Sequence, residues 1–294
     1  MSDDKNIRIG VLYGIGAYLL WGTLPIYWKT LHDVAPLEIL ANRFVWSAVF
    51  VGLLLLATGK LQSFLSETKE IFSNFSTGLR LVLAAITISF NWGLYIWAVS
   101  DGRIVETSMG YYINPLMSIV FGVIFLKERL EKMQLIAVLW AVAGITIMII
   151  KNGSLPWVSV SLAFSFAIYG LLKKIILASS FTTIMLETLI MSPLALYYIY
   201  SLGNSSAYHV ASSGTICMLI GAGVATATPL LLFTQCSKML PLTMHGFIQY
   251  LSPTIALLVG VFVYGEAFTN THIMAFGCIW TGLLFFTWSQ IRKK

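Results

Sequence analysis

The side chains with the greatest capacity for chemistry are a few polar groups set within long apolar stretches of the chain. Asn91, Asn114 and Gln249 carry amides, and Arg43 and Glu187 are ionisable. An amide without a hydrogen-bond partner costs several kcal/mol in an apolar environment. Each amide is therefore expected either to join two helices or to bind a polar group of a small molecule. The sequence leaves both interpretations open.

Aromatic side chains accompany these amides. Tyr95 follows Asn91 by four positions and Tyr111 precedes Asn114 by three, so the members of each pair share one face of a helix. A few polar groups among aromatic walls are typical of a small-molecule site. Further candidates for substrate contact are Trp21, Trp92, Tyr112, Tyr169 and Tyr250. For any one of these rings, ordinary packing is an equally good interpretation.

The same stretches lack the motifs of enzymes and metal proteins. GxSxG, HExxH and GxxxxGK[ST] do not occur. Cys217, Cys236 and Cys278 are scattered, without a CxxC pair or a histidine at ligand spacing, and are interpreted as small buried side chains. We therefore expect no catalysis, no metal site and no cofactor.

Composition identifies the elements that hold these residues. The chain has 294 residues, of which 58% are apolar and 10% charged, and its mean hydropathy is +0.84. Soluble domains carry about 25% charged residues, and long apolar runs with few charges indicate membrane helices. The sequence predicts an all-helical integral membrane protein in the lipid bilayer, with spans at residues 9–30, 37–58, 79–100, 104–126, 132–150, 156–177, 181–201, 214–237, 241–264 and 270–290.

The distribution of lysine and arginine predicts the orientation. Ten spans place both termini on one side, and most basic residues, including Lys173 and Lys174, are assigned to that side. The other side has Lys29, Arg103 and Lys151. The positive-inside rule then places both termini in the cytoplasm. The net charge of +6 is thus interpreted as a topology signal and not as a nucleic-acid-binding surface.

A shift of 138 residues (252 − 114 = 138) superposes the second half of the chain on the first. It carries Asn114–Pro115 onto Ser252–Pro253, Asn91 onto Pro229, and Glu128 onto Glu266. Residues 1–150 and 151–294 would each hold five spans, and an odd number inverts the second half in the membrane. We expect Pro115, Pro253 and Pro229 to kink their helices near the midplane, although membrane helices also tolerate proline without a functional reason.

Inverted repeats with interrupted helices are typical of secondary transporters, whose sites lie at the repeat interface. We expect alternating access, with Asn114 and Gln249 contacting substrate from opposite halves. No charged residue is assigned to the midplane, which favours a neutral amphiphile or a zwitterion. Glu187 is the better candidate for proton coupling, because a carboxylate inside a span can exchange a proton. His245 can also titrate. A second interpretation of Arg43 and Glu187 is that they act as gates of the transport path or as anchors between a helix and a loop.

Six stretches of the chain closely resemble the RarD branch of the EamA family, within the drug/metabolite transporter superfamily: NWGLYIWAV, MGYYINPL, VIFLKERL, LETLIMSP, ATPLLLF and GFIQYLSPT. The resemblance covers essentially the whole chain. It implies ten helices in two inverted repeats around a central cavity. It also implies transport of small metabolites or drugs, often outward, at the inner membrane of a bacterial cell. Glu106–Thr107 depart from the smaller residues expected there.

A channel or facilitator without ion coupling is the alternative function. It would need a polar path along the full length of the bundle, whereas these spans are polar only near their middle. A membrane-embedded enzyme is a weaker alternative, because the motifs above are missing. Gly10 and Gly14 match the GxxxG packing motif, which is too common in apolar segments to indicate an oligomer.

Overall fold

The computed structural model describes residues 2–101, 104–153, 157–264 and 270–291, and within these ranges the chain is helical and has no strand. Long apolar runs favour this outcome, because a helix satisfies its backbone hydrogen bonds within its own segment. The elements, in chain order, are α1 (Ser2–Lys29), α2 (Pro36–Ala57), α3 (Leu61–Ser73), α4 (Phe75–Ser100), α5 (Ile104–Leu126), α6 (Lys132–Asn152), α7 (Trp157–Ile175), α8 (Ser180–Ser201), η1 (Gly203–Ser205), α9 (Ala207–Val210), α10 (Ser213–Met239), α11 (Leu242–Gln249), α12 (Leu251–Tyr264) and α13 (Asn270–Ile291).

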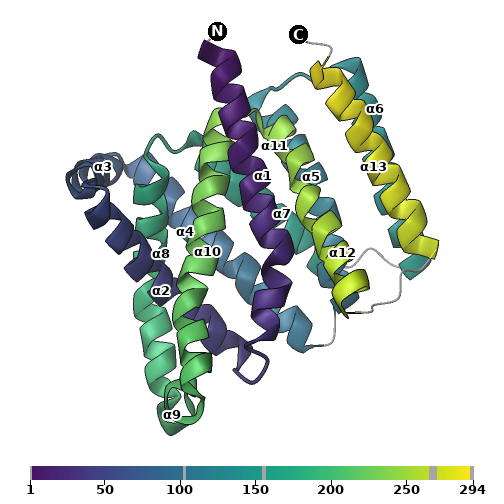
Figure 1. The fold of residues 1–294 in the computed structure, drawn as a ribbon. Helices are drawn as coiled ribbons and strands as arrows, with labels where there is room; N and C mark the ends of the chain where they lie inside the picture. Colours follow the sequence, from purple (N-terminus) through teal and green to yellow (C-terminus); the bar gives the residue numbers. More distant parts are fainter. Residues whose placement is uncertain (1, 102–103, 154–156, 265–269, 292–294) are drawn as a thin grey trace.

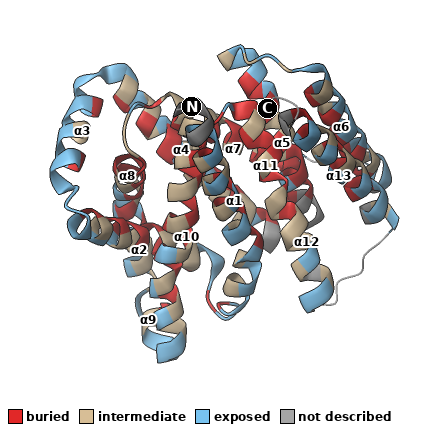
Figure 2. Cartoon of the chain, turned by 45° about the horizontal axis from the view of Figure 1, so that its top comes forward, coloured by how far each residue is buried: buried red, intermediate tan, exposed pale blue. Residues whose placement is uncertain are grey.

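The helices form a bundle suited to a membrane. In the described part of the chain, nine segments are long and apolar enough to cross a bilayer, and a shorter apolar segment, Ile273–Ser289, lies in α13. Each predicted span coincides with one helix, except the ninth. Figure 2 shows the buried positions on the inward sides of the helices and exposed positions on α3 and on the outer sides of α6 and α13. The predicted ten-helix membrane fold is confirmed.

The ninth predicted span is two helices, not one. α11 ends at Gln249 and α12 begins at Leu251, with Tyr250 between them. Pro253 has no N–H, so the carbonyl of Gln249 lacks its usual partner four residues on. By contrast, α5 and α10 continue through Pro115 and Pro229. Of the three prolines predicted to kink their spans, one accompanies a break.

α3 lies in the connection between α2 and α4. It lies on the surface and buries Phe64 and Ile71. The Glu67 carboxylate accepts a hydrogen bond from the backbone N–H of Ser179 at 2.8 Å, which ties α3 to the start of α8. Partial burial by itself would raise the pKa of Glu67, but hydrogen bonds from Thr182 and Ser179 outweigh burial and hold its pKa below the usual value.

α1 begins and α13 ends at the same end of the bundle, which we call the terminal end, and α9 lies at the opposite, distal end (Figure 1). The first helix of each half packs against the other half: α1 contacts α10 and α12, while α7 contacts α4 and α5. The two five-helix halves are therefore interleaved, and a cavity between them would take residues from both.

α6 and α13 pack against each other with reciprocal contacts. A Cβ added to Gly144 would lie 2.7 Å from the carbonyl oxygen of Ala275, and one added to Gly282 would lie 2.7 Å from that of Ala137. Both pairs obey the repeat, since 282 − 144 = 138 and 275 − 137 = 138. A two-fold axis between the halves would produce such an exchange of partners, and we infer that the halves are related in this way.

Candidate transport site

Arg43 lies in a group of side chains contributed by five helices. Its guanidinium carbon is 4.1 Å from the ring centre of Trp92 on α4 and 4.9 Å from that of Trp28 on α1. Its Nε donates a hydrogen bond to Thr226 Oγ1 on α10 at 2.9 Å. Tyr95 on α4 and Tyr111 on α5 interact with it electrostatically. We call these six residues the arginine recess.

Tyr111 is the most exposed member of this group. It shares a helix face with Pro115 and Ser118, which are buried, while the exposed Val120 and Ile124 lie on the other side of α5. Tyr111 is nevertheless 49% exposed. Its ring packs edge-on against Tyr95, with centroids 5.8 Å apart. We infer from this exposure that Tyr111 borders a space between helices and does not face the lipid.

The guanidinium lies deeper in the bundle than the position of Arg43 in the sequence suggests. Arg43 is the eighth residue of α2 (43 − 36 + 1 = 8), but its partner Thr226 is the central residue of α10, fourteenth of 27. The long side chain carries the charge inward. The expectation that no charged group reaches the middle of the spans is therefore wrong for Arg43.

An aromatic layer closes the bundle on the terminal side of the recess. Phe233 of α10 is fully buried and contacts Trp21, Phe166 and Tyr169, with ring centroids 5.3 to 5.7 Å apart. The rings of Phe233 and Tyr169 are stacked at an interplanar angle of 13°. Trp21 and Tyr169, two of the predicted substrate contacts, thus belong to one packed layer.

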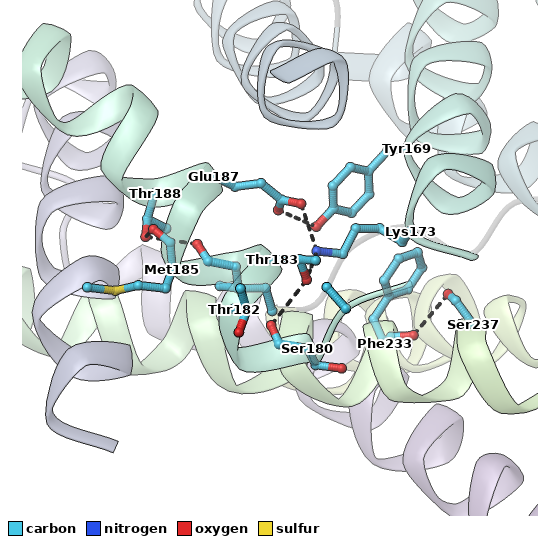
Figure 3. A network of polar contacts seen from close by, with 12 residues as sticks. Tyr169, Lys173, Ser180, Thr182, Thr183, Met185, Glu187, Thr188, Phe233 and Ser237 are labelled. Atoms are coloured by element: carbon cyan, nitrogen blue, oxygen red, sulfur yellow. Dashed lines mark hydrogen bonds and ion pairs between the residues drawn. The ribbon is translucent and has the colours of Figure 1, made fainter. Parts of the chain in front are cut away.

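A buried ion pair lies beyond this layer (Figure 3). Lys173 Nζ is 2.7 Å from Glu187 Oε1 and donates a second hydrogen bond to Thr183 Oγ1 at 2.7 Å. The Tyr169 hydroxyl donates to Glu187 Oε2 at 3.0 Å. Lys173 is 0% exposed. The sequence counts Lys173 among the basic residues of the cytoplasmic side, but its side chain turns into the bundle, whereas Lys174 donates to the carbonyls of Ser237 and Leu240.

His245 connects two helices through both ring nitrogens. Nε2 lies 2.7 Å from the Tyr18 hydroxyl of α1, and Nδ1 lies 3.1 Å from Ser237 Oγ of α10. The histidine is fully buried. A neutral imidazole offers one donor and one acceptor, which matches two hydroxyl partners. His245 is therefore placed to exchange a proton with groups of the protein interior, and not directly with water.

Glu128 binds the start of α11 at the terminal end of the bundle. Its carboxylate accepts hydrogen bonds from the backbone N–H groups of Leu242, at 2.6 Å, and Thr243, at 2.8 Å, at the start of α11. An acidic side chain at a helix N-terminus satisfies donors that have no partner within the helix. Gly122 makes room for this contact, since a Cβ there would lie 2.8 Å from Glu128 Oε2. The repeat partner Glu266 lies outside the described residues.

The predicted amides differ in how far their hydrogen bonds are satisfied. Asn91 donates to the Leu162 carbonyl and to Ser165 Oγ, both at 2.8 Å, and so joins α4 to α7. Gln249 donates to Ser118 Oγ at 2.8 Å, but its Oε1 has no partner among the described residues. The buried Oδ1 of Asn114 also has none there. Asn114 and Gln249 thus each have a buried oxygen acceptor without a partner in the described part of the chain.

Two predicted aromatic contacts lie elsewhere. Tyr112 packs edge-on against Phe276 of α13, with centroids 5.0 Å apart, in an apolar cluster that also contains Tyr250. This cluster joins α5 to α6 and α13. The structure therefore brings Arg43, Trp92, Tyr95 and Tyr111 together, places Trp21, Tyr169, Glu187 and His245 on the terminal side, and separates Tyr112 and Tyr250 from both groups.

The described residues contain no group of three or more His, Cys, Asp or Glu arranged to hold a metal ion. Cys236 is buried as predicted, but Cys217 is exposed.

Two grooves of about 290 and 240 Å³ lie between helices. One is lined by Ile86, Thr87, Phe90, Ser161, Phe164, Ser165 and Ile168, and the other by Tyr13, Phe50, Leu54, Ser180, Phe181, Thr228, Leu231, Leu232 and Gln235. Neither contains a predicted site residue. Gly10 and Gly14 pack against α10 and α11 within the same chain.

Sequence reasoning missed several contributors to these sites. Trp28, Thr226 and Tyr18 were hidden among many similar side chains, and only packing assigns them partners. Lys173 had a weak sequence signal, because the Lys173–Lys174 pair is flanked on both sides by apolar residues in LLKKII. Two adjacent helical residues point about 100° apart, so in a helix packed over most of its circumference one of the two lysines can turn inward.

The chain was compared with known proteins. The model of the EamA-like transporter family matches residues 8–150 and again residues 156–288. The uncharacterized transporter YojE of Bacillus subtilis is 45% identical over 99% of this chain and 98% of its own. Protein RarD of Escherichia coli is 37% identical over 99% of this chain and 98% of its own, and a solved crystal structure of 15% identity superposes with a TM-score of 0.73 over 94% of this chain and 96% of its own.

These matches agree with the geometry of the bundle. The structural likeness, at low identity, shows the fold alone, whereas the family model and the full-length relatives carry the assignment. Because both cover almost the whole chain, this protein is a membrane transporter and a RarD-type member of the EamA-like transporter family.

Proposed function

We propose that this chain is a secondary active carrier that moves a small amphiphilic metabolite or drug across the cytoplasmic membrane by alternating access. The observation that carries the proposal is the unequal access to the interior. On one side of the aromatic layer Tyr111 is half exposed, and on the other Lys173 and His245 are fully buried. A carrier open to one side has this arrangement, and a channel would need a polar path across the layer of Phe233 and Trp21.

The proposal includes outward transport and a definite orientation of the protein in the membrane. If both termini lie in the cytoplasm, as the distribution of basic residues predicts, the arginine recess opens toward the outside of the cell. Glu128 and the buried ion pair then seal the cytoplasmic end. A reporter fused after Lys294 should report the cytoplasm, and a tag in the loop at 202–213 should be accessible from outside. The reverse result would overturn this orientation.

Proton coupling in the proposal uses Glu187. Lys173 and Tyr169 both bind its carboxylate, so protonation would release Lys173 from its partner and favour separation of α7 from α8. Glu187→Gln should then abolish pH-driven transport while exchange across the membrane continues. If pH-driven transport is unchanged in this variant, Glu187 is a structural residue only.

Counterflow in proteoliposomes tests the carrier itself. Radiolabelled chloramphenicol and phenylacetate serve as probes, the first because a relative in Pseudomonas aeruginosa is named chloramphenicol-sensitive protein RarD. We expect saturable uptake, accelerated by unlabelled probe preloaded inside the vesicles, for at least one of them. Uptake that rises linearly without counterflow would indicate the alternative, a channel or facilitator. Uptake equal to that of protein-free vesicles for both probes would reject the proposal.

A further inference from the structure

The Arg43 guanidinium has an uneven set of partners. Nε donates a hydrogen bond to Thr226, and the guanidinium carbon lies over the rings of Trp92 and Trp28. The two terminal nitrogens donate to no side chain or backbone carbonyl among the described residues. No carboxylate of those residues is within ion-pair distance either. The part of the group best suited to bidentate binding of an oxyanion is therefore unoccupied by the protein.

The same bundle shows how a resident cation is normally accommodated. Lys173 is fully buried, and the protein supplies Glu187 at 2.7 Å and Thr183 at 2.7 Å. A cation within a membrane span is expected to pair with an opposite charge, because desolvation is costly. Arg43 differs in having no such partner and in bordering an open recess. Its terminal nitrogens can bind water, but a counter-charge must come from a small anion or from a ligand.

The surroundings of Arg43 favour a ligand with an apolar body. Trp92 and Trp28 flank the guanidinium, and Tyr95 and Tyr111 lie next to it, with the exposed face of Tyr111 toward the open space. Aromatic walls bind an apolar or aromatic group, and the hydroxyls of Thr226 and the tyrosines add polar contacts. Asn114, three residues after Tyr111 on α5, presents an acceptor without a partner in the described chain.

We infer that the arginine recess binds the carboxylate group of an anionic, predominantly aromatic substrate, with Arg43 as its counter-ion. This inference rests on the proposed carrier function and names the substrate class of the same site. It replaces the expectation of a neutral or zwitterionic substrate, which assumed that no charge reaches the middle of the bundle. Arg43 determines specificity, because its planar guanidinium offers the terminal nitrogens to a carboxylate as a fork, and the rings of Trp92 and Trp28 pack against its central carbon.

The test compares phenylacetate with phenylacetamide, which has almost the same shape and no charge. Binding to the purified protein is followed by tryptophan fluorescence, since two tryptophans flank Arg43. We expect phenylacetate to bind at least ten-fold more tightly than the amide. Arg43→Met should abolish this preference, and Arg43→Lys should retain part of it, because a lysine keeps the charge but not the fork. Arg80→Met, on α4 near the terminal end, is the matched control and should behave as wild type.

Three results would overturn the inference: equal affinity for acid and amide, no detectable binding of phenylacetate at tens of millimolar, or an unchanged preference in Arg43→Met. A purely structural role for Arg43 would lower the melting temperature of Arg43→Met and leave the preference intact. Counterflow separates this inference from the carrier proposal. If both probes exchange across the membrane at the same rate in wild type and in Arg43→Met, the anion site is rejected and the carrier function stands. If phenylacetate binding depends on Arg43 but neither probe exchanges, the carrier function is rejected and the anion site stands.

Discussion

Two ionisable residues occupy the same position in the second helix of each half and have opposite environments. Arg43 is the eighth residue of α2, and Glu187 is the eighth residue of α8 (187 − 180 + 1 = 8). Glu187 is buried and bound by Lys173 and Tyr169. Arg43 has aromatic neighbours and one hydroxyl partner. Matching helix positions thus carry a completed ion pair at one end of the bundle and an incomplete one at the other.

The difference teaches that the repeat constrains packing more strongly than charge. At α6 and α13 the reciprocal contacts of Gly144 and Gly282 have the same 2.7 Å distance. Close packing leaves few solutions at a helix crossing, so both halves retain the small residue. A charged group is constrained only by its need for a partner, and that partner can be part of the chain or part of a ligand.

The largest effect is expected from removing one member of the buried pair. Lys173→Met leaves Glu187 as a buried charge without its partner, which costs about 3–5 kcal/mol, whereas Arg43→Met should cost about 1 kcal/mol, the scale of a cation–π contact. Thermal unfolding in detergent, followed by fluorescence, measures both. The double variant Lys173→Met with Glu187→Met should be more stable than Lys173→Met. If Arg43→Met and Lys173→Met cost the same, the contrast between the two positions is wrong.

A smaller and symmetric effect is expected at the α6–α13 contact. Gly144→Ala and Gly282→Ala should each destabilise the protein by about 1–3 kcal/mol, because the new Cβ would overlap a backbone carbonyl. The double variant should cost less than the sum, since one separation of the helices relieves both clashes. Gly277→Ala, where a Cβ would meet nothing within 4 Å, is the control and should be neutral or slightly stabilising. Unequal costs at Gly144 and Gly282 would argue against equivalent halves.

The smallest effects on stability, but clear effects on affinity, are expected at the amides. Asn114→Leu and Gln249→Leu should weaken phenylacetate binding about five- to a hundred-fold, since leaving a buried polar partner unpaired costs about 1–3 kcal/mol. Asn114→Leu should leave the melting temperature nearly unchanged, because the Oδ1 of Asn114 has no partner to lose among the described residues. Asn91→Leu is the contrasting variant: it breaks bonds to α7 and should lower stability without changing affinity. If Asn114→Leu instead unfolds the protein, Asn114 joins helices.

Much of the fold could be predicted because it follows from local properties of the chain. Apolar length predicts each span, since hydrocarbon admits only segments that satisfy their own backbone. The ninth span shows the limit of this reasoning. Its apolar run is continuous, yet α11 and α12 are separate helices, while α5 continues through Pro115. A proline removes one hydrogen bond in both cases, and the neighbouring helices decide whether the backbone breaks.

The sequence by itself determined that this is a ten-helix membrane protein with related halves, and it drew attention to Arg43 and Glu187 as ionisable residues within spans. Only the tertiary structure decided the partner of each. The sequence places Lys173 beside Lys174 among the basic residues of one side of the membrane. In the structure Lys173 is the counter-ion of Glu187, because the face of α7 that carries Lys173 points into the bundle. Thr226 and Trp92 become partners of Arg43 because α10 and α4 meet α2 there. Hydrophobicity acts along the chain, whereas pairing of charges depends on which helices approach, and that depends on packing across the whole bundle.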